Sequence, residues 1–152
     1  MIGVEILDER KSTTWFVFFI GDTSFIWPSK KQLTVTLSSK EAEYVSVNSV
    51  VCHLIWLKNM LKHLRFPQKN PTEIYVDNRS TIILAKNSVY HERSKHINTC
   101  HHSIREYVEN KEVKLISCKT NDQVANIFTK PLKRETFIIL KFMLGMKSLD
   151  WV

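Results

Sequence analysis

The longest regular pattern of hydrophobic positions lies in the first half of the chain. Aliphatic residues recur there at alternate spacings of three and four, at Val47, Val50, Leu54, Leu57, Leu61 and Leu64. This spacing puts them in one stripe and predicts a long helix with one buried face. Ser38 and Glu41 fit a capping box at its start, with Ser38 as the N-cap and Glu41 as the reciprocal acid.

Shorter apolar runs predict strands on both sides of this helix. Residues 13–20 are rich in β-branched and aromatic side chains, and Gly21-Asp22 turns the chain into residues 24–27, so a hairpin is expected. Further strands are expected at residues 33–37, 73–76 and 112–117, and residues 2–7 are compatible with an edge strand. Helices are expected at residues 79–86, 96–110, 123–128 and 134–144, with a polar loop at residues 88–95.

Two carboxylates stand out against this pattern. Asp77 ends an apolar strand just before a helix, where open α/β sheets bind ligands. Extending the helix stripe back by four residues leads to Glu43, and a carboxylate in a core-facing row needs a partner, a proton or a cation. Glu41 is rotated from it by roughly 200° around the helix. Two alternatives remain open: Asp77 or Asn78 only caps the next helix, and Glu43 lies beyond the core in water.

Composition and charge narrow the class of protein. The 152 residues are 43% hydrophobic and 11% aromatic, which suits a single globular domain over residues 1–152. The net charge of +7 favours an anionic partner, and no apolar run approaches the ~20 residues of a membrane span, so nucleic acid is favoured over lipid. The start of the chain does not resemble a signal peptide and the three cysteines show no pairing pattern. An intracellular setting, cytoplasm or nucleus, is therefore expected.

Other site chemistries have weaker support in the sequence. His96, Cys100, His101 and His102 are close together but lack the paired ligand spacing of zinc sites. Basic residues gather at Lys30 and Lys31, within residues 58–69, and at Arg93, Lys95 and His96. Such groups are often only solvated faces, yet with the overall charge they suit phosphate contacts. No glycine-rich phosphate loop and no serine or cysteine nucleophile signature is present.

Four stretches together resemble a known family. They read TLSSKEAEY at residues 36–44, VDNRS at 76–80, HERSKHI at 91–97 and NDQVANIFTKPL at 121–132. In this order they resemble the ribonuclease H domain at the C-terminal end of copia-type LTR retrotransposon polyproteins, over about residues 8–145. The resemblance implies an α/β fold, an RNase H-like mixed sheet flanked by helices. It also implies Mg²⁺-dependent cleavage of RNA in RNA–DNA hybrids, next to a reverse transcriptase. Such enzymes hold two metal ions about 4 Å apart between acidic ligands.

The resemblance assigns roles to particular residues. Glu43 matches the family's helix carboxylate and Asp77 its central-strand aspartate, both as metal ligands. Nucleic-acid contacts are expected from Lys30, Lys31, Arg79, Ser80, Arg93, Lys95 and His96. The family's first catalytic aspartate would fall before Met1, and its fourth acidic position is Asn126. Asp122, one helical turn before Asn126 if this segment is helical, is a candidate to replace the lost acid.

These departures predict a weakened site. Two carboxylates balance the charge of one divalent ion, so we expect weak binding of a single Mg²⁺ ion and impaired or lost cleavage. The first strand of the sheet is expected to be truncated or missing. At the end of the long helix, Arg65 stands where the family commonly has a glycine, which predicts the loss of a left-handed C-cap. Such scattered changes are typical of a degenerate copy, a pseudoenzyme. A non-catalytic nucleic-acid-binding remnant and a non-functional pseudogene product are the alternatives.

Overall fold

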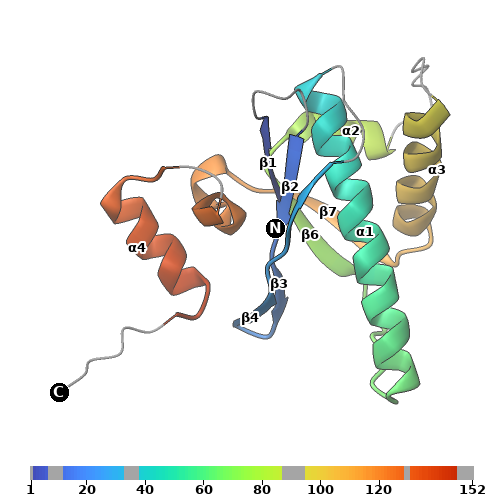
Figure 1. The fold of residues 1–152 in the computed structure, drawn as a ribbon. Helices are drawn as coiled ribbons and strands as arrows, with labels where there is room; N and C mark the ends of the chain where they lie inside the picture. The colour runs from blue at the N-terminus through green and yellow to red at the C-terminus, as the bar shows by residue number, and fades with distance from the viewer. Residues whose placement is uncertain (1, 7–11, 33–37, 87–94, 129–130, 147–152) are drawn as a thin grey trace.

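The protein is a mixed α/β structure, as the sequence predicts. The computed structural model describes residues 2–6, 12–32, 38–86, 95–128 and 131–146 (Figure 1). The strands are β1 (Ile2–Ile6), β2 (Ser12–Phe16), β3 (Phe18–Ile20), β4 (Thr23–Ile26), β5 (Ser29–Lys31), β6 (Thr72–Val76) and β7 (Val113–Ser117). The helices are α1 (Ser39–His63), α2 (Arg79–Lys86), α3 (Lys95–Glu109) and α4 (Arg134–Met143), with 3₁₀ helices η1 (Thr120–Asp122) and η2 (Val124–Phe128).

The strands form three hydrogen-bonded groups that lie next to one another. β1, β2 and β5 are antiparallel, β3 and β4 form the predicted hairpin, and β6 pairs with β7 in parallel. The predicted strand at residues 13–20 is divided at Val17, so β3 continues the line of β2 and β4 continues into β5. A first strand is present as the five-residue β1, which pairs with β2 and contacts β6.

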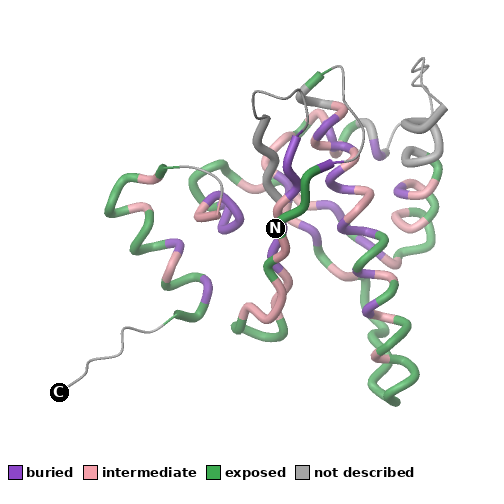
Figure 2. Tube along the Cα trace, viewed as in Figure 1, coloured by how far each residue is buried: buried purple, intermediate pink, exposed green. Residues whose placement is uncertain are grey.

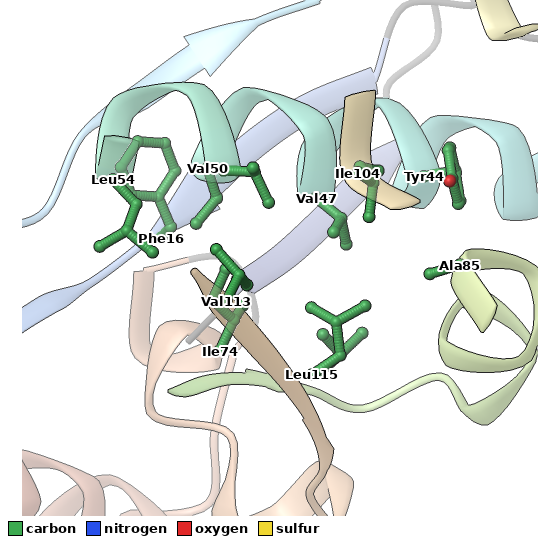
Figure 3. Close-up of a cluster of buried hydrophobic side chains, with 12 residues drawn as sticks. Phe16, Tyr44, Val47, Val50, Leu54, Ile74, Ala85, Ile104, Val113 and Leu115 are labelled. Atoms are coloured by element: carbon green, nitrogen blue, oxygen red, sulfur yellow. The ribbon is translucent and has the colours of Figure 1, made fainter. Parts of the chain in front are cut away.

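The main hydrophobic core lies between α1, α3 and the strands. Side chains from α1 point toward Ile74 of β6 and Val113 and Leu115 of β7, with Ile104 of α3 beside them (Figure 3). A second, smaller hydrophobic cluster lies where Val17, between β2 and β3, packs against η2 and α4. Its buried residues are Val17, Val124, Ala125, Leu140 and Leu144. In Figure 2 the buried positions follow one side of α1 and the strands. Within the described part of the chain, no helix is long and apolar enough to span a membrane.

The predicted stripe of α1 is confirmed over most of its length. Val47, Val50, Leu54 and Leu57 are buried, Leu61 is half-buried, and Ser38 Oγ accepts the N-cap bond from the Glu41 backbone N–H at 3.2 Å. The prediction fails at Leu64, which is 58% exposed because the helix has ended there, at its C-cap. The core-facing row therefore extends from Val47 to Leu61.

The C-terminal end of α1 differs from the prediction for Arg65. Arg65 adopts the left-handed conformation with φ 66°, its N–H bonds to the Lys62 carbonyl, and the Phe66 N–H bonds to the Leu61 carbonyl. These two bonds form a Schellman motif, so the expected loss of the cap is wrong. Lys111 ends α3 in the same way with φ 56°, and Gly145 ends α4 with φ 77°. The motif thus forms at two ends without glycine.

Two other segments affect the predicted site. Residues 33–37 and most of the predicted 88–95 loop lie outside the described residues, whereas residues 123–128 form not an α-helix but η2. Gln123, between η1 and η2, has an extended backbone with ψ 97°. Asp122 is consequently exposed while Asn126 is buried, so the expectation that the two side chains share a helix face is wrong.

Candidate active site

Glu43 projects from the second turn of α1, a part of the helix that polar contacts hold against the strands. The side-chain amide of Gln32, just after β5, donates to Thr14 Oγ1 of β2 at 3.0 Å and to the Ala42 carbonyl of α1 at 2.8 Å. It also lies 2.9 Å from Ser46 Oγ, which is 2.7 Å from Thr14 Oγ1. All of these groups are buried. Ala42 and Ser46 lie on either side of Glu43 in the sequence. Their contacts with Gln32 therefore hold this turn of α1, and Glu43 with it, in place.

Asp77 and Asn78 follow β6 and approach Glu43 from the sheet. Asn78 Nδ2 donates to Glu43 Oε2 at 2.6 Å, and Asn78 Oδ1 accepts from the Ser80 backbone N–H at 2.9 Å. Asn78 thus caps α2 and also connects it to α1. The structure thus confirms the capping alternative for Asn78. Asp77, the residue before it, does not take this role and lies close enough to Glu43 to affect its carboxylate. The sequence predicts only a capping role for Asn78, although this residue stands within the VDNRS motif; its bond to Glu43 makes it a further residue of the site.

The environment of Glu43 favours its protonated form. Burial and the neighbouring Asp77 carboxylate together raise the pKa of Glu43 to about 7, although the hydrogen bond from Asn78 acts in the opposite direction. Glu43 Oε1 is buried, and no described donor bonds to it. Two carboxylates that face each other in this way require a proton or a cation between them. The alternative in which Glu43 lies in open water is therefore wrong.

The residues fit a cation only in part. The carboxylates of Glu43 and Asp77 are suitable hard ligands for Mg²⁺, and Glu43 Oε1 is the buried oxygen to which no described donor bonds. Across the described residues, however, no group of three or more His, Cys, Asp or Glu side chains is arranged to hold a metal ion. The side chains of Cys100 and His101 lie outside the described part of the structure. The charges of Glu43 and Asp77 together can balance one divalent ion.

The other end of the site is formed after β7, which lies beside β6. The Cys118 backbone N–H donates to the Val76 carbonyl at 2.9 Å, so Cys118 lies next to Asp77. Burial, Asp77 and then Asp122 raise the pKa of the Cys118 thiol, which keeps it protonated. Asn126 Nδ2 donates to the Thr120 carbonyl at 2.8 Å and is 3% exposed. Cys118 was not predicted as a site neighbour, because only the parallel pairing of β6 and β7 brings it to Asp77.

The residues expected to contact nucleic acid have different environments. Lys30 and Lys31 are exposed on β5, Arg79 is exposed at the first position of α2, and the Ser80 N–H is used by Asn78. Lys95 and His96 belong to the first turn of α3 with undescribed side chains, and Arg93 lies outside the described residues. Within the 58–69 group, Lys58 is bonded to the carboxylate and the carbonyl oxygen of Glu112. Lys58 is thus already paired within the protein, whereas Lys62, Arg65 and Lys69 are exposed.

Comparison with known proteins finds similarity to retrovirus-related Pol polyproteins of plant transposons. The chain is 39% identical over 142 residues to the retrovirus-related Pol polyprotein from transposon TNT 1-94 of Nicotiana tabacum. This alignment covers 93% of the chain and 11% of the polyprotein. It is 38% and 37% identical over 130 residues to the corresponding polyproteins from transposons RE2 and RE1 of Arabidopsis thaliana. These alignments cover 86% of this chain and 9% of each polyprotein. No protein-family profile and no solved structure matches the chain.

Proposed function

Since this chain is homologous to a small segment of retrovirus-related Pol polyproteins from plant transposons, we propose that it is the RNase H-like part of a copia-type element. Its ancestral reaction is metal-dependent cleavage of RNA in RNA–DNA hybrids, and substitution has impaired or abolished that reaction here. The observation that carries the proposal is the meeting of Glu43 with Asp77 and Asn78 in a half-buried, acidic site.

Each group in this site has a separate task in the proposal. Glu43 and Asp77 would hold one Mg²⁺ ion, and the Asn78 amide keeps one Glu43 oxygen in place. When bound, the ion would polarise a phosphate oxygen and activate water for in-line attack. Asn126 supplies no negative charge where a second ion needs one, so the residues present lack the charge for a two-ion site. Weak binding of one ion with little or no turnover is the expected result.

Metal binding is the first test of the proposal. Addition of millimolar Mg²⁺ at pH 8 should raise the Tm of the wild-type chain by a few degrees, because a ligand that binds the folded state stabilises it. The increase should disappear in Asp77→Asn and in Glu43→Gln and persist in Glu41→Gln. Asn126→Asp should tighten Mg²⁺ binding, whereas Asp122→Ala should leave it unchanged, because Asp122 is exposed and does not share a helix face with Asn126. An equal Mg²⁺ effect in all variants would contradict the site.

Cleavage of a labelled RNA–DNA hybrid separates a degenerate site from a working one. We expect no Mg²⁺-dependent cleavage above that of Asp77→Asn. Clear turnover that is lost in Asp77→Asn would show that the enzyme is active and would contradict the proposed impairment, while leaving the RNase H-like assignment intact.

A second function, a non-catalytic nucleic-acid-binding module, is favoured by a different observation. The net charge is +7, and Lys30, Lys31 and Arg79 are exposed cations. Phosphate contacts of such residues position a nucleic-acid backbone without reading its sequence. This function predicts binding that does not depend on Mg²⁺ or on Asp77. The two functions are compatible, and RNA–DNA hybrid or duplex is the proposed partner of both.

A further inference from the structure

The C-terminal end of α1 carries exposed apolar side chains on the side that the core does not use. Trp56, Met60 and Leu64 are spaced four residues apart, so they follow one another in one row along the helix. Trp56 is 62% exposed, and Phe66, which comes just after the helix, is 69% exposed. Met60 and Leu64 are exposed as well. We call these four residues the α1 patch.

This end of α1 extends away from the rest of the protein. In Figure 1 the helix continues past the neighbouring strands and past α3, and Figure 2 shows exposed positions around its end. An apolar surface in water is unfavourable, and several such side chains together are typical of an interaction site. The α1 patch is therefore open to another molecule.

The charge around the α1 patch is of one sign. Residues 44–72 contain no aspartate or glutamate. Lys62, Arg65 and Lys69 are exposed, and no ion pair between described residues includes them. Lys62 lies in the last turn of α1, where a cation also interacts favourably with the helix dipole, but Arg65 and Lys69 lie beyond the end of the helix. Positive charges without an acidic partner thus accompany the apolar side chains.

We propose that the α1 patch is a docking surface for an amphipathic helix of a partner protein, which has one apolar face with acidic residues beside it. A row of side chains four residues apart packs well against the apolar face of a second helix. Trp, Phe, Met and Arg are enriched in protein interfaces, and Trp and Arg often contribute most of the binding energy. The acidic residues of the partner pair with Lys62, Arg65 and Lys69.

Other occupants match the α1 patch less well. A second copy of this chain has a net charge of +7, and contact between two patches would bring like charges together. Nucleic acid suits the cations and can stack on Trp56, but Met60 and Leu64 offer the bases no aromatic face. A helix with an apolar face and acidic flanks matches both the aliphatic side chains and the cations.

The docking surface is separate from the proposed active site. Glu43 and Leu64 lie roughly 30 Å apart along α1, at about 1.5 Å for each helical residue. The inference uses none of the carboxylates that would bind Mg²⁺. Its failure would therefore leave the proposed nuclease ancestry unaffected.

Binding of a designed peptide tests the docking surface. The probe is a fluorescein-labelled peptide of about 18 residues, long enough to form a helix, with leucine on one face and glutamate on the other. Its fluorescence anisotropy should rise when the whole chain is added at micromolar concentration. The same peptide with lysine in place of glutamate should not bind. Absence of binding by the acidic peptide, or equal binding of both peptides, would overturn the proposal.

Two pairs of substitutions locate the binding site. Trp56→Ala and Lys62→Glu should each weaken binding of the acidic peptide by about tenfold, because they remove an apolar anchor and reverse a pairing charge. Trp27→Ala and Lys133→Glu are the matched controls, since Trp27, between β4 and β5, and Lys133, before α4, are exposed outside the patch. The controls should leave the affinity unchanged. Equal losses in the variants and in their controls would contradict the α1 patch as the binding site.

Two further probes identify the other kinds of occupant. Oligo(dT) and phosphatidylserine vesicles are both anionic, and neither should lose binding in Trp56→Ala. A loss of about tenfold with oligo(dT) in this variant would assign the patch to single-stranded nucleic acid. The same loss with vesicles would assign it to a lipid surface. Either result would overturn the proposed protein partner.

Discussion

Glu43 carries a charge that folding disfavours. Its pKa is raised to about 7 in the folded protein, from an ordinary value of 4.5, by burial and by Asp77. The folded state consequently binds this proton more tightly than the unfolded state does. Between these two pKa values, stability falls as pH rises, because deprotonation costs more in the folded protein. The contribution of Glu43 is complete below about pH 4.5 and is lost as pH rises through 7.

Glu43→Gln should therefore change the pH dependence of stability. Glutamine has the shape of the protonated acid, so the variant should match the wild type near pH 5 and unfold a few degrees higher at pH 8.5, without added metal. Thermal unfolding at several pH values measures this difference. Glu41→Gln is the control, because it removes a carboxylate from the first turn of the same helix. A constant difference between Glu43→Gln and the wild type from pH 5 to pH 8.5 would show that the charge of Glu43 has no effect.

Arg65 and Lys111 hold left-handed conformations that glycine adopts without steric cost. Such a conformation costs a residue with a Cβ atom about 1 kcal/mol, partly offset by the greater freedom of glycine in the unfolded chain. Arg65→Gly and Lys111→Gly should each stabilise the protein by about 0.5–1 kcal/mol in urea unfolding. Gly145→Ala should have the opposite effect, because its φ is 77° and a Cβ atom would lie 3.1 Å from the Asp22 carbonyl oxygen. Destabilisation by Arg65→Gly would contradict the cap geometry.

At the scale of elements, α1 depends on a buried polar cluster as well as on its apolar stripe. Gln32, Thr14 and Ser46 join β5, β2 and α1. Gln32→Leu should cost about 1–2 kcal/mol of unfolding free energy, because it removes buried hydrogen bonds. It should also weaken Mg²⁺ binding, since Glu43 lies between the two α1 residues that Gln32 contacts. Gln68→Ala, an exposed glutamine, should change stability by less than about 0.5 kcal/mol. Equal effects of the two variants would exclude the structural role of Gln32.

At the scale of the whole molecule, net charge should control nucleic-acid binding. The affinity for a hybrid duplex should fall steeply with salt. The combined Lys30→Ala, Lys31→Ala and Arg79→Ala variant should reduce the slope of log K against log salt by roughly 0.9 for each phosphate that it no longer neutralises. Lys114→Ala is the control, because Lys114 is already paired with Glu73 at 3.0 Å. Fluorescence anisotropy at several salt concentrations measures both. An unchanged slope in the triple variant would place the nucleic acid on another surface.

Local patterns in the chain predicted most of the elements. The period of the α1 stripe, the Ser38 cap and the Gly21 turn depend on residues a few positions apart, and the structure confirms each of them. The same kind of reasoning failed at residues 123–128, where 3₁₀ turns replace a predicted helix, and at Arg65, where the surrounding chain imposes the left-handed cap. In both segments, interactions of the folded chain override the local preference.

The sequence by itself determined that Glu43 lies in line with the apolar stripe of a long helix and that Asp77 ends a strand, because side-chain periodicity is a local property. Only the tertiary structure decided that Asn78 bonds to Glu43 across 35 positions of the chain and that Cys118 lies beside Asp77. Burial and electrostatic repulsion depend on which distant segments pack together. The raised pKa of Glu43 therefore arises only when the chain folds.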